Sequence, residues 1–221
     1  MAMGDVSLDR EIKQFNRLRA EVVVENLKKK YMDGHFVETK EQALELLLNL
    51  IPAGARLGRG DSVTLNQLGV FEALIERGEN EFINPVKTDK KGYNPPREER
   101  RAMQRQTLLS DVYLAGTNAI TMEGTIINCD GSGNRVAAMC FGPKKVILVV
   151  GCNKIVRDVE AGLARIRDWA CPVNMWRHKL KHNKDDGLGW GVMRYTCIID
   201  GNQPVEQGKI TVILVNEDLG M

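Results

Sequence analysis

Polar side chains gather between Asp111 and Lys154, a stretch that begins and ends with apolar runs. A buried sheet does not need closely spaced amides, carboxylates and a guanidinium, whereas a site for a polar ligand does. We therefore expect a binding site within this stretch. Its candidate residues are Asn118, Thr121, Asn128, Asp130, Asn134 and Arg135.

The chemistry of these side chains suits a small, oxygen-rich anion. Arg135 offers a planar fork for a carboxylate or phosphate, and the asparagines supply both donors and acceptors. Asp130 can accept hydrogen bonds from hydroxyl groups or orient a base. Gly131 and Gly133 permit positive φ or close approach of a ligand to the backbone. Singly, each residue also has a structural interpretation, such as an Arg135–Asp130 ion pair or an Asp–Gly turn. Their concentration in one short span favours a site.

Two further segments supply candidate residues. Lys154 follows residues 145–151, KVILVVG, a continuous apolar run typical of a parallel strand buried on both faces. Ligands gather beyond the carboxyl ends of such strands, so Lys154 is a second candidate cation. Residues 55–64 read as a strand, a glycine-rich turn and a helix start. This order predicts either an anion or carbonyl cradle or a plain strand-to-helix turn.

The five cysteines form no C-x-x-C pair, so neither a disulfide framework nor a cysteine-rich metal site is expected. Cys129 lies beside Asp130, where a nucleophilic thiol is one interpretation. A strand residue that faces the core is the favoured interpretation.

The segment from residue 176 to 191 contains residues at the spacing of metal ligands. His178 and His182 have the i, i+4 spacing of a helix, and Asp185 and Asp186 are nearby. The surrounding lysines and arginines would repel a cation, so a solvated basic segment is favoured. No metal ligand is predicted in this sequence.

Charge and hydropathy narrow the class of protein. The chain has 31 lysines and arginines against 29 aspartates and glutamates, a net charge of +2. This charge is too small to attract nucleic acid or an anionic membrane over the whole surface. No apolar run approaches the ~20 residues of a membrane span. The first residues, MAMGDVSLDREIKQF, lack the apolar core of a secretory signal. We expect a cytoplasmic protein with neither nucleic acid nor membrane as partner.

Periodicity predicts the elements that must position the candidate residues. Apolar residues at helical spacing predict an amphipathic helix over residues 7–31, and a capping box of Thr39 and Gln42 predicts the start of a second helix. Residues 122–124 can close a hairpin, and a helix over residues 155–169 is expected to end at Cys171–Pro172. Alternating strands and helices predict one α/β domain over residues 35–221. Residues 1–34 form a helical appendage whose apolar face makes a homodimer a candidate assembly.

The run GTNAITMEGTIINCDGSGNRVAAMCFGPKKVILVVGCNKIV, residues 116–156, closely resembles the signature of the LUD domain, the family of lactate utilisation protein C. The segments GRGDSVTLNQLGV, RIRDWACPVN and KITVILVNEDLG also resemble the family, in the family's order. The resemblance implies the fold of ribose-5-phosphate isomerase and the CoA transferases, a three-layer α/β sandwich with a mostly parallel sheet. It further implies that the site is lined by Gly116, Asn118, Glu123, Gly124, Asn128, Asp130, Gly133, Asn134 and Lys154, and faced by Gly58, Gly60, Ser62 and Thr64.

The resemblance also implies a role beside the oxidation of lactate to pyruvate, with iron–sulfur oxidoreductase subunits as candidate partners. Some family members carry a cysteine-rich segment before the last strands, but here only Cys197 stands in that region. No iron–sulfur cluster is therefore expected in this chain, and its cofactors are otherwise unknown.

The leading hypothesis is an accessory subunit that binds a small anionic metabolite during the use of lactate or another 2-hydroxy acid. One alternative is a stand-alone sugar-phosphate isomerase or CoA-transferase-like enzyme with Glu123 or Asp130 as general base. A second alternative is a non-enzymatic metabolite sensor or scaffold. The sequence leaves open whether the protein is an enzyme.

Overall fold

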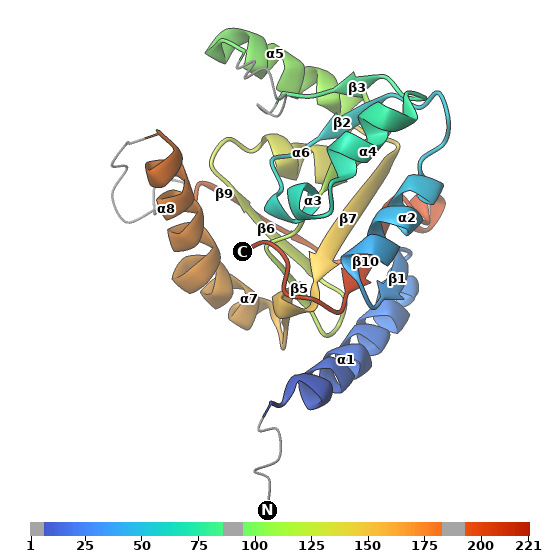
Figure 1. The fold of residues 1–221 in the computed structure, drawn as a ribbon, viewed down its shortest axis with the longest axis vertical. Coiled ribbons are helices and arrows are strands. Elements are labelled where there is room, and N and C mark those ends of the chain that lie inside the picture. The colour runs from blue at the N-terminus through green and yellow to red at the C-terminus, as the bar shows by residue number, and fades with distance from the viewer. Residues whose placement is uncertain (1–6, 86–94, 183–192) are drawn as a thin grey trace, which may run out of the picture.

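A six-stranded parallel sheet forms the centre of the computed structural model, which describes residues 7–85, 95–182 and 193–221 (Figure 1). Its strand order is β1-β10-β7-β4-β2-β3, and each neighbouring pair is parallel. The strands are β1 (Asp33–Val37), β2 (Leu57–Arg59), β3 (Phe82–Ile83), β4 (Val112–Ala115), β7 (Lys145–Gly151) and β10 (Ile210–Val215). The predicted α/β architecture with a mostly parallel sheet is confirmed.

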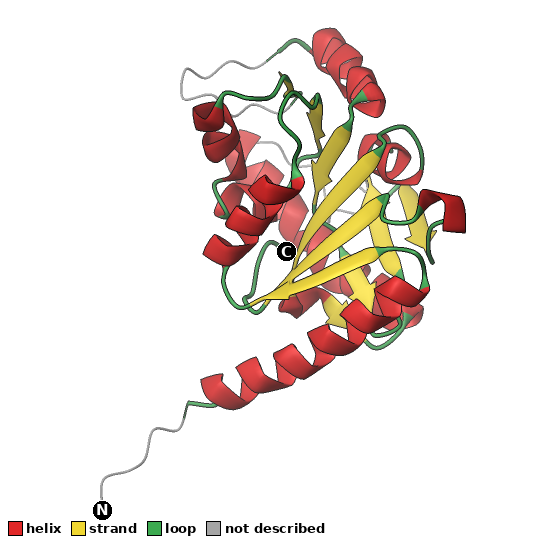
Figure 2. Ribbon diagram, turned by 90° about the vertical axis from the view of Figure 1, so that its right-hand side faces the viewer, coloured by secondary structure: helices red, strands yellow, loops and turns green. Residues whose placement is uncertain are grey.

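Both faces of this sheet are buried, which explains the continuous apolar runs of its central strands. Side chains alternate between the faces with the period of two that a pleated strand imposes. In β7, Val146 and Leu148 pack with helices α1 (Asp9–Lys29) and α6 (Asn134–Cys140). Ile147 and Val149 pack on the other face with α2 (Lys40–Leu50), α3 (Val63–Gln67) and α4 (Val70–Arg77). Figure 2 shows these helices on the two sides of the strands, so the three-layer sandwich is confirmed.

A second sheet of four short strands follows the order β8-β5-β6-β9. It consists of β5 (Ala119–Thr121), β6 (Ile126–Asp130), β8 (Ile155–Val156) and β9 (Tyr195–Ile199). The antiparallel pair β5–β6 is the hairpin that the sequence predicts around residues 122–124. One face of this sheet joins the main core, and the other packs against α7 (Val159–Arg165) and the helix that follows it.

That following helix differs from the sequence prediction. The chain does not leave the helix at Cys171–Pro172. Instead, a π-helical turn, Ile166–Ala170, connects α7 to α8 (Cys171–His182). Proline lacks the N–H that an uninterrupted α-helical ladder would require, and the wider π turn lies where that interruption falls. The helical path therefore continues past Pro172 and brings α8 alongside the ends of the main strands.

The predicted boundary at residue 34 falls inside β1, because residues 33–37 pair with β10 in the main sheet. The second half of α1 also belongs to the core, since Ala20, Val23 and Leu27 are fully buried. The first half of α1 projects from the body and exposes apolar side chains, of which Phe15 is 60% exposed (Figures 1 and 2). The homodimer expected through this helix stays a prediction.

The remaining described elements are α5 (Arg97–Gln106), which buries none of its residues, and the short 3-10 turns Thr107–Leu109, Cys152–Lys154 and Pro204–Glu206. Of the helices within the described ranges, none combines the length and the apolar character that crossing a membrane requires.

Candidate functional site

The strand order reverses between β2 and β4. From β2 the chain passes outward through α3 and α4 to β3, whereas from β4 it leads toward β7 on the other side. In open parallel sheets, ligands bind in the crevice beyond the carboxyl ends of two such strands. A pocket of about 340 Å³ lies there, with Arg59 and Asp61 from the end of β2 and Asn118 from the segment after β4 in its walls.

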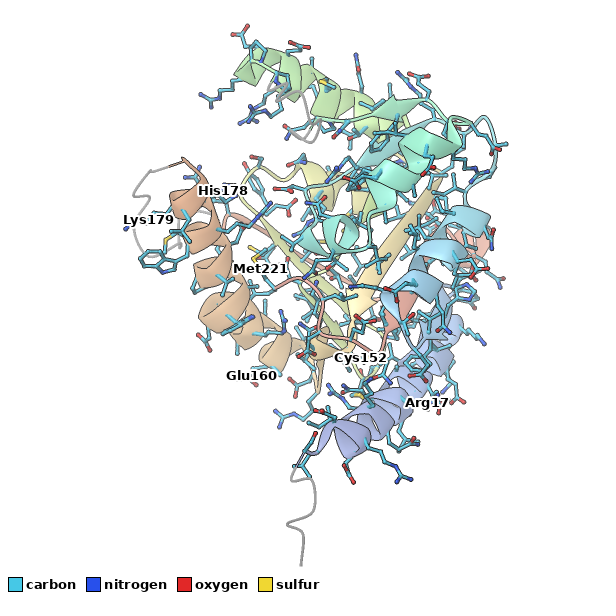
Figure 3. The ribbon with its side chains drawn as sticks, in the orientation of Figure 1. Arg17, Cys152, Glu160, His178, Lys179 and Met221 are labelled. Carbon is cyan, nitrogen blue, oxygen red and sulfur yellow. The ribbon has the colours of Figure 1, made fainter. Side chains whose placement is uncertain are left out.

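The end of β6, the start of α6 and the helix α8 complete the pocket. Asp130 and Arg135 come from the first two, and Arg177 and His178 from α8. Figure 3 shows His178 on α8 and Met221 on the terminal segment, both of which line the pocket. Segments far apart in the chain therefore meet at the point that the sheet topology indicates.

Asp130 and Arg135 form a buried ion pair in the pocket wall. Nε of Arg135 donates to Oδ1 of Asp130 at 2.9 Å, and the backbone N–H of Val136 donates to Oδ2 at 2.9 Å. The second contact joins the carboxylate to the first turn of α6, where the positive end of the helix dipole stabilises a negative charge. Asp130 therefore anchors α6 to β6 as well as facing the pocket.

The Arg135 guanidinium is already occupied by protein acceptors. Besides Asp130, it donates to Oδ1 of Asn118 at 2.8 Å and to the carbonyl oxygens of Cys129 and Gly116 at 3.0 and 3.3 Å. Asn118 Oδ1 also accepts from the backbone N–H of Cys129 at 2.9 Å. This network holds the loops after β4 and β6 together. Most N–H groups of Arg135 therefore bind protein acceptors, as expected if the residue has a structural role.

Arg59 is the less satisfied cation. Its side chain is fully buried, its guanidinium carbon lies 3.2 Å from the centroid of the Phe71 ring, and it donates to Asn66 and to the Gly60 carbonyl. Nη1 has no hydrogen-bond partner among the residues that the structure describes. Burial lowers the pKa of Arg59 to about 10, so the group stays charged at neutral pH. An unsatisfied buried donor costs about 1–3 kcal/mol, which an acceptor from a ligand would recover.

A second ion pair closes the pocket on the side of α8. Arg177 donates to both carboxylate oxygens of Asp61 at 3.3 Å. Burial disfavours ionisation of Asp61, but Arg177, Arg59 and His178 together lower its pKa. Asp61 is thus matched by Arg177 and Asp130 by Arg135. Arg59 makes no ion pair within the described part of the chain, and the pocket has one arginine more than it has aspartates.

Lys154 lies behind this pocket rather than in its wall. Its side chain is 3% exposed, and Nζ donates to Oγ1 of Thr64 at 3.0 Å. Burial, with the charges of Arg165 and Arg135, lowers the pKa of Lys154 to about 7. The segment that contains Gly220 covers the pair, because a Cβ atom on that residue would lie 2.8 Å from Nζ. The predicted contact of Lys154 with an anion would require this segment to move.

The glycine-rich turn after β2 does meet the segment after β4, as expected. Ser62 caps α3 by accepting from the backbone N–H of Leu65 at 3.3 Å. Gly116 permits this approach, because a Cβ atom there would lie 2.9 Å from Oγ of Ser62. Gly60 lies against Tyr113, whose buried hydroxyl has no hydrogen-bond partner in the described structure.

The other candidate glycines divide between the pocket and the scaffold. Gly131 lines the pocket with Asn134, and Gly133, at φ +77°, begins α6. Gly58 instead packs against Thr107 and Ser110, which approach its Cα closely.

Four candidate residues serve the β5–β6 hairpin or its packing and do not line the pocket. Glu123 is exposed in the hairpin turn, and Gly124, at φ +83°, packs against the backbone of α1. Thr121 accepts from the backbone N–H of Thr125 at 3.0 Å, and Asn128 is buried and donates to Met139. The structure therefore separates Glu123 from Asp130, the other candidate general base.

The structure describes only part of the segment from residue 176 to 191. His178 lines the pocket, whereas the side chain of His182 and residues Asp185 and Asp186 lie outside the described residues. Within the described ranges, no three His, Cys, Asp or Glu side chains gather as metal ligands would.

Sequence reasoning missed Arg59 and Arg177. Arg59 is the last residue of a buried strand and stands between two glycines, Gly58 and Gly60. An arginine where burial is expected is an unusual signal that could have identified it. Arg177 gives no such signal, because it lies within a run of basic residues.

Residues 20–215 match the family model described as the LUD domain, which confirms the family resemblance of the sequence motifs. A DUF162 family protein from Deinococcus radiodurans has a similar solved structure, with 14% sequence identity and a TM-score of 0.49. The alignment covers 92% of this chain and 97% of that chain. No curated protein is significantly similar to the chain.

Proposed function

The chain belongs to the LUD-domain family, which is associated with lactate utilisation, and on that premise we propose that it binds a small anionic metabolite in the Arg59 pocket. The observation that carries the proposal is the buried Arg59 guanidinium, which has a free donor and no ion pair among the described residues. A buried charge is costly unless it is paired. A ligand with one negative charge would pair it.

The shape and chemistry of the pocket narrow the ligand class. A volume of about 340 Å³ is at the lower end of the range for small-molecule sites. Oδ1 of Asn118 accepts from Arg135 and Cys129, whereas Nδ2 makes no hydrogen bond to the described residues. A 2-hydroxy or 2-oxo monocarboxylate would place its carboxylate at Arg59 and its second oxygen near an amide donor of this kind.

We place this binding activity in an accessory subunit for the oxidation of lactate or another 2-hydroxy acid. The family association supports this role, and the proposed ligand class agrees with it. Iron–sulfur oxidoreductase subunits are the proposed partners, as the family resemblance implies.

An enzymatic alternative rests on Asp130, which lines the same pocket as Arg59. A stand-alone isomerase or CoA-transferase-like enzyme would use this carboxylate as its general base, since Glu123 is outside the pocket. Turnover of sugar phosphates or acyl-CoA by the purified protein, lost in Asp130→Asn, would favour this alternative.

Thermal unfolding with lactate, pyruvate and sugar phosphates tests the binding proposal. A ligand at a hundred times its Kd stabilises by about 2.7 kcal/mol, which raises Tm by roughly 5–10 °C for a chain of this size. We expect this rise in the wild type and in Arg101→Met, where an exposed arginine of α5 is removed, but not in Arg59→Met. An equal rise in Arg59→Met would contradict the proposal.

A further inference from the structure

Two cysteines meet in the wall of the pocket. Cys129 belongs to β6 and Cys171 is the first residue of α8, and both line the pocket. The two side chains belong to one buried cluster with Ile127 and Ile166, and each thiol shifts the pKa of the other. Each is largely buried, with 8% and 7% of its surface exposed. Both residues therefore contribute to the wall of the pocket that ligands would enter.

Local structure explains why the thiols meet. The register of β6 against β9 places Thr196 opposite Cys129, and the Thr196 hydroxyl donates to Sγ of Cys129 at 3.6 Å. The π-helical turn Ile166–Ala170 ends at Cys171. Single π turns are rare and occur frequently at functional sites.

The surroundings make the two thiols chemically different. The hydrogen bond from Cys171, with those from Thr196 and the charge of Arg135, lowers the pKa of Cys129 to about 6 against the effects of burial and Asp130. The same hydrogen bond and burial raise the pKa of Cys171. The lowered pKa favours the thiolate form of Cys129 over that of Cys171. A thiolate is the nucleophilic form of cysteine.

We propose that Cys129 and Cys171 form a peroxide-reactive dithiol in the pocket wall, with Cys129 as the nucleophile and Cys171 as the resolving thiol. The substrate class is a small hydroperoxide. This proposal does not depend on which anion binds at Arg59, because the dithiol uses different atoms of the pocket.

The reaction has two steps. The Cys129 thiolate attacks the terminal oxygen of the hydroperoxide, the O–O bond breaks, and the alkoxide or hydroxide leaves and takes a proton from solvent. Cys129 is then a sulfenic acid. The sulfur of Cys171 attacks the sulfur of Cys129, the S–O bond breaks, and hydroxide leaves with the Cys171 proton as water. The peroxide is reduced to an alcohol or water, and the two thiols are oxidised to a disulfide that small thiols can reduce again.

The disulfide would join β6 to α8 beside Asp130. Since α8 also supplies Arg177, oxidation would fix the position of the helix that closes the pocket. The dithiol would then make ligand binding sensitive to peroxide.

The oxidation of a second cysteine pair must be distinguished experimentally from that of Cys129 and Cys171. Sγ of Cys140 and Sγ of Cys197 are 3.3 Å apart, and Cys140 is exposed at the end of α6. Asn128 and Cys197 face each other in the β6–β9 register, so this pair lies on the face of the ladder opposite to Cys129 and Thr196. It can oxidise independently, and Cys140→Ser/Cys197→Ser therefore provides the background for the test.

The experiment treats that double variant with one equivalent of hydrogen peroxide at pH 7 and maps the products by mass spectrometry. We expect a Cys129–Cys171 disulfide, and with Cys171→Ser added, a sulfenic acid on Cys129 that a dimedone label traps. With Cys129→Ser added, Cys171 should stay unlabelled. Absence of both products, or equal labelling of Cys171 in the last variant, would overturn the proposal.

The unmodified protein supplies a test that no failure of folding can obscure. Alkylation of the wild type by iodoacetamide should modify Cys129 with a midpoint near pH 6, while Cys152, whose pKa burial raises to about 12, stays unmodified up to pH 8. A midpoint for Cys129 above pH 8 would contradict a thiolate nucleophile. Neither result depends on ligand binding, so failure here leaves the Arg59 proposal intact.

Discussion

Arg59 stacks on Phe71, with 3.2 Å between the guanidinium carbon and the ring centroid. The stack fixes the plane of the guanidinium, while Asn66 and the Gly60 carbonyl hold two of its nitrogens. Only Nη1 lacks a protein acceptor in the described structure. Arg59 therefore keeps one donor for an acceptor from a ligand, which a small movement of the pocket wall must expose because the side chain is fully buried. Arg135 instead donates to Asp130, Asn118 and two carbonyl oxygens.

This contrast predicts effects of different size on stability when each arginine is replaced by methionine. Arg59→Met removes an unsatisfied buried donor but also a cation–π contact worth about 0.5–2 kcal/mol, so unfolding free energy without ligand should change by less than about 1 kcal/mol. Arg135→Met leaves the Asp130 carboxylate buried and unpaired, and should cost about 3–5 kcal/mol. Urea unfolding of both variants measures the difference. An equally large loss in Arg59→Met would show that Arg59 has a mainly structural role.

Asn118→Asp should weaken ligand binding without removing the oxygen that accepts from Arg135. The substitution keeps the oxygen that accepts from Arg135 and Cys129, but it replaces the Nδ2 donor with a negatively charged oxygen. An anion in the pocket would lose a donor and meet a like charge, so its affinity should fall at least about tenfold, or 1.4 kcal/mol. Titration calorimetry with the anion that stabilises the wild type measures this loss.

Glu123→Gln is the control for that experiment, because Glu123 is exposed in the β5–β6 turn beside α1. We expect wild-type affinity in this variant. A loss of affinity comparable to that of Asn118→Asp would place the site at the hairpin turn instead of the switch-point pocket.

The architecture could be predicted because its causes are local. The run KVILVVG indicates a strand buried on both faces, and Thr39 does cap α2, accepting from the backbone N–H of Gln42 at 3.3 Å. Strand β1 could not be predicted, because its five residues follow a strong helix signal. They form a strand only by pairing with β10, which lies far along the chain. The continuation of the helix past Pro172 could not be predicted either, since a π turn has no sequence signal of its own.

The region of the site could be predicted from the sequence, but the contacts among its residues could not. Asn118, Asp130, Asn134 and Arg135 do line one pocket, close to the Gly60 turn. Their roles could not be predicted, because the ion pair that satisfies Arg135 depends on the start of α6, which the sequence did not indicate. The unsatisfied state of Arg59 and the meeting of Cys129 with Cys171 depend on tertiary contacts alone.

Lys154 should make stability depend on pH. Its pKa of about 7 in the folded protein lies below the ordinary value of 10.5, so above pH 7 the unfolded chain binds more protons than the folded protein. Unfolding free energy must therefore rise with pH in this window, by about 2 kcal/mol from pH 7 to pH 9. Urea unfolding of Lys154→Met should show higher stability at pH 7 and lack this rise. The exposed Lys29→Met should keep it, and a rise that persists in Lys154→Met would assign it to other groups.

Gly220→Ala should reduce the same pH dependence by hydrating Lys154. Gly220 has φ +70°, and a Cβ atom on it would lie 2.5 Å from Oγ1 of Thr64, closer than real atoms approach. The covering segment must then shift, water reaches Nζ, and the pKa of Lys154 returns toward its ordinary value. Gly69→Ala is the matched control, because Gly69 also has φ +70° but nothing within 4 Å of the added atom. Both variants should lose about 1–2 kcal/mol to backbone strain. Only Gly220→Ala should reduce the rise in unfolding free energy between pH 7 and pH 9. A rise equal to that of the wild type in this variant would show that another part of the protein excludes water from Lys154.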